Sequence, residues 1–258
     1  MPESFPGTRR QVTAVVISLN EERRIERCLE SLRWADEIVV VDSGSVDGTV
    51  GIARRYTDKV ASVPWKGFGP QKQAAVDLAS HDFVLNVDCD EVVTPELAAE
   101  IEVILRGERI SPVYSVPRRT FLGEKEIRHC GWYPDRTVRL FDRRQARFSE
   151  DLVHERVVAS GEASVCREHL LHYSFDGLSD LLVKLNRYSD LSARQMSGRG
   201  RRCGVFDLLL RPPIAFFRTY VLRLGFLDGY EGFLISCTTA LLALAKYAKL
   251  RELHRRHP

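Results

Sequence analysis

The 258-residue sequence predicts an α/β fold, with a mostly parallel β-sheet covered by helices on both faces and a helical C-terminal extension. Short Val- and Ile-rich runs alternate with helical patterns four times in the first hundred or so residues, which is the order of right-handed β-α-β crossovers. The last part of the chain instead holds helical patterns without strands between them. It is basic, whereas the region before it is acidic.

Four strand–helix units make up the first half of the predicted sheet domain. Strands are expected at Val12–Leu19, Glu37–Val41, Lys59–Val63 and in Phe83–Glu91. Helices are expected from Asn20 to about Leu32, at Thr49–Tyr56, at Gln71–Ala79 and from Pro95 to about Arg106. Thr94 is the predicted N-cap of the last of these helices, since Pro95 suits the first helical position.

After Gly107 the pattern changes to short strands, followed by long helices. The strand candidates are Val113–Thr120, Thr137–Phe141, Val153–Val158 and His169–Phe175. The helical candidates are Leu178–Met196, an arginine-containing apolar segment at Phe206–Leu227 that Pro212-Pro213 breaks, and Gly229–Leu250. We therefore expect a catalytic domain over residues 1–177, with halves of about 10–107 and 108–177, and an extension over 178–258.

Composition narrows the classes of protein that the chain can belong to. The six cysteines are scattered without a CxxC pair, which favours core positions in a reducing compartment over disulfides or zinc ligation. The N-terminus has no apolar signal-peptide core. The apolar run Phe233–Ala245 is shorter than the roughly 20 residues that cross a bilayer. A net charge of +3 without a stacking-aromatic module argues against nucleic acid as a partner.

Three acidic residues, Asp88, Asp90 and Glu91, follow the fourth strand. Carboxylates so close together repel one another, so the strand end is either a divalent-metal site or a solvated cap of the next helix. The carboxyl ends of parallel strands share one edge of the sheet, where ligands bind. Asn20 and Asp42 end the first and second strands, so they are expected beside Asp88 and Asp90, and this convergence favours the ligand and metal interpretation.

The loop Asp42–Thr49 (Asp-Ser-Gly-Ser-Val-Asp-Gly-Thr) lies between a strand and a helix, where backbone N–H groups can receive an anion. It matches neither the GxxxxGK[ST] phosphate loop nor the GxGxxG dinucleotide fingerprint. Asp42 could accept a hydrogen bond from a base or ribose. Taken alone, the same residues also describe a tight turn capped by the aspartate.

The three segments together resemble the family 2 glycosyltransferases of the Rossmann-like GT-A fold. Asn20-Glu21-Glu22, Asp42–Thr49 and the DxD-containing Asp88–Glu91 occur in the family's order, and the resemblance extends over roughly the whole chain. A narrower likeness is to bacterial enzymes that transfer glucose in β-1,4 linkage to the heptose of the lipopolysaccharide inner core. It rests on Gly131–Arg136, Val138–Asp142, Val153–Glu155, His172–Tyr173 and Gly225–Gly229.

This resemblance implies a role for each matching residue. Asp42 is expected to contact the base of a UDP-sugar, Asp88 the ribose or sugar, and Asp90 an Mn2+ or Mg2+ ion on the diphosphate. Asp88 and His172 are further candidates for the metal. Ser43 stands where the family often has a second aspartate. The expected nucleotide-sugar site comprises Asn20, Glu22, Asp42, Ser43, Gly44, Lys72, Asp88, Arg136 and Arg139.

Inverting transfer needs a general base for the acceptor hydroxyl. Glu150-Asp151 resembles the family's usual acidic pair, and Val153-His154-Glu155 resembles the form of the inner-core branch. Glu155 is the favoured base and Asp151 the second candidate. For Lys72 a solvated helix face is as good an interpretation as a diphosphate contact, and His172 could be structural.

The basic tail predicts where the enzyme meets its acceptor substrate. Arginines among apolar residues in Phe206–Leu227, and the cations Lys246, Lys249, Arg251, Arg255 and Arg256, are typical of a segment that lies on an anionic membrane. A helical lid on the catalytic domain is the alternative. The prediction is a peripheral enzyme on the cytoplasmic face of the inner membrane, acting on lipopolysaccharide core. Alternatives are a transferase for polyprenyl phosphate or another cell-surface glycan, a non-catalytic nucleotide- or membrane-binding module and, last, a nucleic-acid binder.

Overall fold

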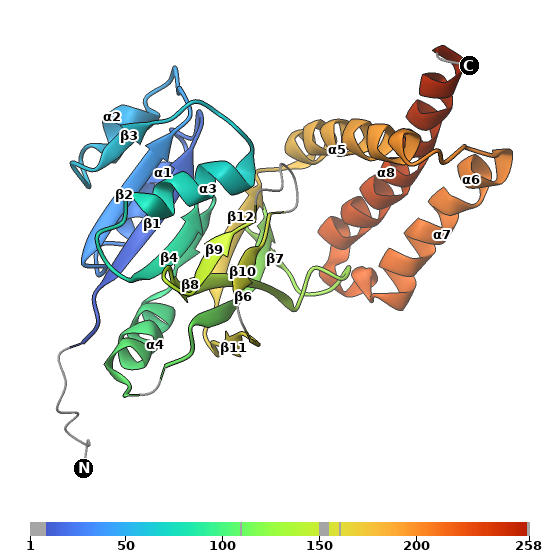
Figure 1. Cartoon of the computed structure of the whole chain (residues 1–258). Helices are drawn as coiled ribbons and strands as arrows, with labels where there is room; N and C mark the ends of the chain where they lie inside the picture. The colour runs from blue at the N-terminus through green and yellow to red at the C-terminus, as the bar shows by residue number, and fades with distance from the viewer. Residues whose placement is uncertain (1–8, 109, 150–154, 160, 257–258) are drawn as a thin grey trace. The chain divides into compact units, whose positions relative to one another are not determined.

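The computed structural model describes residues 9–108, 110–149, 155–159 and 161–256 (Figure 1). Its contacts divide the chain into two compact units. The first contains the described residues up to Arg118 together with Asp135–His172, and the second contains Arg119–Pro134 and the chain from Tyr173 onward. The second unit thus includes residues 119–134, which the sequence analysis placed in the catalytic domain. The boundaries at residues 119 and 134 are set by contacts between segments far apart in the sequence, so no local sequence pattern marks them.

The first unit is built around a mixed sheet in the order β3-β2-β1-β4-β8-β6-β12-β5, with β11 pairing beside β6. Strands β1 to β4 are mutually parallel, as the alternating pattern predicted, and β8 runs antiparallel to β4. A separate hairpin joins β9 to β10. The strands are β1 Val12–Ser18, β2 Glu37–Asp42, β3 Val60–Ser62, β4 Phe83–Asp88, β5 Glu91–Val93, β6 Val113–Leu122, β8 Asp135–Asp142, β9 Ala146–Phe148, β10 Val157–Ala159, β11 Ser164–Val165 and β12 Leu170–Phe175.

Helices cover both faces of this sheet, because the residues of each strand alternate between two apolar cores. Val12, Ala14 and Val16 pack with the buried residues of α1, α2 and α4, whereas Val15 packs with those of α3 and the β9–β10 hairpin. The helices are α1 Ile25–Glu30, α2 Thr49–Ala53, α3 Phe68–Asp77 and α4 Pro95–Arg106. All four expected strand–helix units are present.

Two helix starts show how local chemistry sets the boundaries. Thr94 caps α4 as predicted, since its hydroxyl accepts a hydrogen bond of 3.1 Å from the backbone N–H of Leu97. Helix α1 begins at Ile25 rather than at Asn20. Asn20 has a φ of 55° and its polar groups bond to the loop after β2, so the chain cannot enter a helix there.

In the second unit, β7 (Lys125–Ile127) pairs with the end of β6, and the remainder is helical. Pro212 and Pro213 occupy the start of α7, so the chain breaks before them as expected. Gly232 lets the start of α8 approach the backbone of Gly225, because a Cβ there would meet the Gly225 carbonyl oxygen at 1.8 Å. The elements are α5 Leu178–Gly198, α6 Val205–Leu209, α7 Arg211–Phe217, the π-helical turn η1 Arg218–Leu222, the 3-10 turn η2 Gly225–Asp228 and α8 Gly229–Arg256.

The last helix is longer than its most apolar run. Gly225–Arg255 is long and apolar enough to cross a membrane by length and composition. The run Phe233–Ala245, which is too short to span by itself, is thus part of a longer helical segment. A single helix of this kind is weak evidence for a span.

Candidate active site

The loops after β1 and β2 are locked together by hydrogen bonds. The side-chain oxygen of Asn20 accepts from the backbone N–H of Val46 at 2.9 Å, and the carboxylate of Glu22 accepts from that of Gly48 at 2.9 Å. In return, the backbone N–H of Asn20 donates to the hydroxyl of Ser45 at 2.8 Å. The first two strand ends are thus neighbours, as expected, and Asn20 and Glu22 shape the loop that Asp42 begins.

Asp42 organises its own turn. Its carboxylate accepts hydrogen bonds from the backbone N–H groups of Gly44 and Ser45, at 2.8 and 2.7 Å, and from the hydroxyls of Ser45 and Ser18. Burial raises the pKa of this carboxyl, but these hydrogen bonds outweigh burial and the net pKa is lowered. Gly44 supplies the positive φ of 97° that the turn requires. The tight-turn interpretation therefore describes Asp42 in the free chain, and contact with a base stays a prediction.

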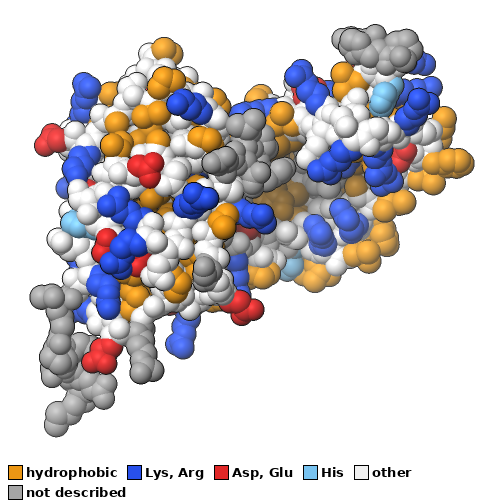
Figure 2. All heavy atoms as spheres, in the orientation of Figure 1, with side chains coloured by type: hydrophobic (Ala, Val, Ile, Leu, Met, Phe, Trp, Pro, Cys, Tyr) orange, Lys and Arg blue, Asp and Glu red, His pale blue; other side chains and the backbone are white. Residues whose placement is uncertain are grey.

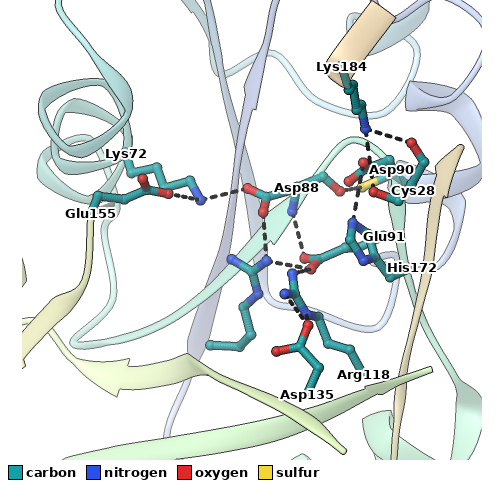
Figure 3. A network of polar contacts seen from close by, with 12 residues as sticks. Cys28, Lys72, Asp88, Asp90, Glu91, Arg118, Asp135, Glu155, His172 and Lys184 are labelled. Atoms are coloured by element: carbon teal, nitrogen blue, oxygen red, sulfur yellow. Dashed lines mark hydrogen bonds and ion pairs between the residues drawn. The ribbon is translucent and has the colours of Figure 1, made fainter. Parts of the chain in front are cut away.

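Strand β4 ends on an ion-pair chain that crosses the edge of the sheet (Figure 3). One carboxylate oxygen of Asp88 lies 2.9 Å from the ammonium of Lys72, and the other lies 2.6 Å from the guanidinium of Arg139. Lys72 also donates to Glu155 at 2.9 Å. Burial raises the pKa of Asp88, yet the charges of Arg139 and Lys72 hold it well below its usual range. Asp88, Lys72, Arg139 and Glu155, which lie far apart in the sequence, are thus brought together.

Glu91 is the buried anchor of this chain of charges. The alternative of a solvated helix cap does not describe Glu91, since the residue begins β5 and is fully buried. It accepts from Arg139 and, at 3.1 Å, from Arg118. It also accepts from the backbone N–H of Asp88 at 3.0 Å. Glu91 therefore fixes the orientation of the strand end that carries Asp88.

Two members of the chain of charges were missed by sequence reasoning. Arg118 bridges Glu91 and Asp135, and its guanidinium lies within hydrogen-bonding distance of both carboxylates. The pairing of Arg118 with Asp135 follows from the antiparallel register of β6 and β8. Asp135 lies in Gly131–Arg136, one of the segments that carry the narrower resemblance, and that segment was the signal that could have found it.

Comparison with known proteins decides the family. Residues 13–170 match the family described as Glycosyl transferase family 2, which is more than half of the chain. The chain belongs to this family. The lipopolysaccharide core biosynthesis glycosyltransferase LpsC of Rhizobium meliloti is 32% identical over 94% of this chain and 93% of its own length. The family, the GT-A-like α/β fold and the assignment as a glycosyltransferase enzyme are thereby confirmed.

Two solved structures show more distant likeness. The S. aureus TarS 1–349 structure is 16% identical, with a TM-score of 0.49, over 96% of this chain and 92% of that one. Glucosyl-3-phosphoglycerate synthase from Mycobacterium tuberculosis, solved with Mn2+ and UDP-glucose, is 28% identical with a TM-score of 0.35. It covers 43% of this chain and 44% of its own. Both scores are too low to transfer ligands from these proteins.

Within this family 2 glycosyltransferase, Asp90 and His172 form the pair best suited to a metal. A carboxylate oxygen of Asp90 lies 3.4 Å from Nε2 of His172, and β12 brings His172 opposite Glu91. Asp88 is less suited, because Lys72 and Arg139 already occupy its two oxygens. Among the described residues no group of three or more acidic, His or Cys side chains is arranged to hold a metal. The pair fits an ion that takes its remaining ligands from a diphosphate and water.

The other predicted contacts differ in how far their side chains are buried. Arg139 is 3% exposed, and although burial lowers its pKa, the carboxylates of Asp88 and Glu91 raise it to a net value above the ordinary one. Arg136, in contrast, is exposed. Ser43 has a buried hydroxyl that finds no hydrogen-bond partner among the residues that the structure describes. The binding roles of these residues stay predictions.

One candidate base can be placed. The side chain of Glu155 is 19% exposed and paired with Lys72, whereas Asp151 lies outside the described residues.

The nearby cysteines are structural. Burial raises the pKa of the Cys28 thiol, with smaller contributions from neighbouring acids, and Cys89 behaves in the same way. Both thiols donate to backbone carbonyl oxygens, Cys28 to Asp88 at 3.5 Å and Cys89 to Ile17 at 3.2 Å. A protonated thiol is a poor nucleophile and metal ligand, so the site depends on oxygen and nitrogen groups. All six cysteines are unpaired, as expected from their spacing.

Proposed function

We propose that this chain is an inverting, metal-dependent glycosyltransferase that moves a hexose from a UDP-sugar to a heptose of the lipopolysaccharide inner core. UDP-glucose is the first candidate for the donor. The observation that carries the proposal is the position of Lys72, whose ammonium lies 2.9 Å from both Asp88 and Glu155. It joins a carboxylate at the strand end, where donors bind in such sheets, to the carboxylate of the candidate base.

The transfer needs a base for the acceptor hydroxyl and positive charge near the departing diphosphate, and Glu155 and Lys72 can supply these. The acceptor hydroxyl oxygen forms a bond to C1 of the hexose while the bond from C1 to the diphosphate oxygen breaks, and UDP leaves with that electron pair. Glu155 takes the proton of the hydroxyl. Lys72 is placed to offset negative charge on the departing diphosphate.

Asp90 and His172 would hold a divalent ion, and such an ion would neutralise charge on the diphosphate. Asp88 would contact the ribose or sugar. The buried Glu91, with Arg118 and Arg139 around it, holds Asp88 in position.

The acceptor side of the proposal rests on the relative and on the second unit. The Rhizobium meliloti relative is named as a lipopolysaccharide core biosynthesis glycosyltransferase, and this chain matches nearly all of its length. Exposed apolar residues on α6 and α7 suit a protein that works at a membrane surface. We infer peripheral attachment at the cytoplasmic face of the inner membrane, where nucleotide sugars and a lipid-linked acceptor meet.

The test is UDP release by the full-length protein with Mn2+ or Mg2+, a panel of UDP-sugars and inner-core acceptors that are intact or delipidated. Glu155→Gln should abolish transfer while leaving UDP binding intact. The control is Glu162→Gln. Glu162 is an exposed acid that forms no ion pair with the described residues, so removing its charge should leave turnover unchanged. Turnover that survives in Glu155→Gln would move the base to Asp151.

The acceptor panel also separates the alternatives. Activity only with polyprenyl phosphate or another glycan would keep the reaction and change the acceptor. UDP binding without UDP release for any donor and acceptor would make the chain a binding module.

A further inference from the structure

Tyr247 in α8 is surrounded by cationic side chains from three segments of the second unit. The guanidinium carbon of Arg211 lies 4.9 Å from the centre of its ring, the ammonium of Lys246 lies 5.3 Å away, and the guanidinium carbon of Arg201 lies 5.8 Å away. The face of an aromatic ring attracts a cation. Three cations around one ring also repel one another, so attraction to the ring leaves part of the arrangement unexplained.

The charge of these residues is poorly compensated within the unit. Asp207 forms an ion pair with Arg211. One of its carboxylate oxygens accepts from the guanidinium of Arg211 and the other from the backbone N–H of Gly204. Among the described residues, no carboxylate pairs with Arg201, Arg218 or Lys246.

The repulsion is visible at Lys246. Burial lowers the pKa of its ammonium, and the positive charges of Arg211, Arg201 and Arg218 lower it further. We refer to Arg201, Arg211 and Lys246 around Tyr247, together with Arg218, whose charge acts on Lys246, as the Tyr247 cluster. A bound anion would relieve the repulsion within it.

Apolar side chains adjoin the Tyr247 cluster along the chain. Leu209, Leu210 and Ile214, next to Arg211, are 65%, 51% and 60% exposed. Figure 2 shows hydrophobic side chains gathered over α6 and α7, with Lys and Arg side chains alongside them. Cations beside exposed aliphatic residues are typical of surfaces that lie in the headgroup region of a bilayer.

We propose that the Tyr247 cluster is a binding site for the phosphate of an anionic phospholipid at a bilayer surface. The proposal deepens the proposed function, on which it rests for the lipid-linked acceptor, by giving the membrane partner a defined site. A soluble phosphate would satisfy the cations but leave Leu209, Leu210 and Ile214 in water. A bilayer surface covers both kinds of side chain at once.

The proposed headgroup contacts involve fewer basic residues of the tail than the sequence predicted. Lys249, one of the cations expected to contact headgroups, is instead held by α5. Its ammonium lies 2.8 Å from Asp190, 2.7 Å from the side-chain oxygen of Asn186 and 2.8 Å from the hydroxyl of Ser189. The headgroup contacts should therefore come from the Tyr247 cluster and not from every basic residue of the tail.

The experiment measures co-sedimentation of the full-length protein with vesicles of phosphatidylcholine alone or with phosphatidylglycerol added. The test variant is Arg211→Gln/Arg218→Gln/Lys246→Gln. The control variant, Arg54→Gln/Arg187→Gln/Arg194→Gln, removes the same charge from exposed arginines that have no recorded ion pair. Because each basic residue at an anionic surface contributes about 1 kcal/mol, the test variant should bind on the order of a hundredfold more weakly. The control variant should bind like the native protein.

Circular dichroism checks that both variants fold. A Leu210→Trp reporter should show a blue shift in its fluorescence on phosphatidylglycerol vesicles, and high salt or alkaline carbonate should release the protein. The proposal would be overturned by an equal loss of binding in the test and control variants, or by equal binding to neutral and to anionic vesicles. Full competition by millimolar inorganic phosphate would also overturn it. Resistance to carbonate would show an integral protein and would also overturn it.

The outcome is separable from that of the proposed function. UDP release with a delipidated acceptor should be the same in the test variant and the native protein, because no residue of the Tyr247 cluster belongs to the transfer site. Absence of transfer in all forms would reject the glycosyl-transfer proposal while leaving vesicle binding to decide the phosphate site.

Discussion

The ammonium of Lys72 lies 2.9 Å from Oδ1 of Asp88 and 2.9 Å from Oε1 of Glu155, so one buried cation joins the strand end to the candidate base. In the free protein Glu155 is therefore paired with Lys72. A diphosphate bound near Asp88 would compete for the same ammonium, and its arrival would leave Glu155 free to accept a proton. The solvated-helix alternative for Lys72 is wrong, since the residue is 5% exposed.

Lys72→Met should weaken donor use more than acceptor use. A hydrogen bond to a charged group contributes about 1.5–3 kcal/mol, so we expect the donor KM to rise roughly 10- to 100-fold, with a lower kcat. Steady-state UDP release at varied donor and acceptor concentrations measures both constants. Lys66→Met is the control, because Lys66 is exposed and has no recorded ion pair. An unchanged donor KM in Lys72→Met would remove Lys72 from the site.

Asp90→Asn should weaken divalent-metal binding in the presence of UDP. Asp90 faces His172 at 3.4 Å, and the amide that replaces it carries no charge. Loss of an outer-shell partner alone costs roughly 10- to 100-fold in metal affinity, and loss of a direct ligand should cost at least as much. Titration calorimetry of Mn2+ into the UDP complex gives the affinity, with exposed Asp58→Asn as the control. Native Mn2+ affinity in Asp90→Asn would show that the metal assignment is wrong.

Glu37 should make the stability of the first unit depend on acid. Burial raises its pKa, but hydrogen bonds from Lys59, Ser80 and Thr13 lower it from 4.5 to a net value of about 2. A depressed folded-state pKa means that this stabilisation is complete above the unfolded value of 4.5 and is lost as the pH falls towards 2.

The measurement is the thermal midpoint of unfolding over that pH range. Glu37→Gln should lower the midpoint near neutral pH and flatten its dependence on pH between 4.5 and 2. Glu162→Gln, at an exposed position, should leave the profile unchanged. A profile of the same slope in Glu37→Gln and the native protein would assign the acid transition to other carboxylates.

The parallel half of the fold could be predicted from local patterns, because the periodicity of apolar residues identifies each strand and the helix that follows it. The adjacency of Asn20, Asp42 and Asp88 followed from strand order alone. The partners of Glu91 could not be predicted in this way. Arg118 of β6 lies near Glu91 of β5 because only β12 separates these two strands in the sheet, and the sequence does not reveal that order of strands.

Only the family resemblance gave Asp88 and Asp90 different roles, and sequence reasoning could not tell how each of the three acids at the end of β4 is buried and paired. Asp88, Asp90 and Glu91 are chemically alike and adjacent, yet the structure buries Glu91 fully and pairs Asp88 with two cations. Which acid turns inward depends on the short strand β5 and its antiparallel pairing with β12, a contact between segments far apart in the chain. The same limitation applies to the boundary of the second unit at residues 119–134.

Glu91→Gln should destabilise the first unit strongly, because it leaves Arg118 and Arg139 with too little compensating charge around a fully buried position. Breaking a buried ion pair by removing one partner costs about 3–5 kcal/mol. Denaturant unfolding gives the loss, and Glu96→Gln, at an exposed acid in the first turn of α4, is the control. Glu91→Gln/Arg139→Leu should recover part of the stability, because it removes one buried cation together with its partner. A double variant less stable than Glu91→Gln by the full cost of Arg139→Leu alone would show that Glu91 and Arg139 are not energetically coupled.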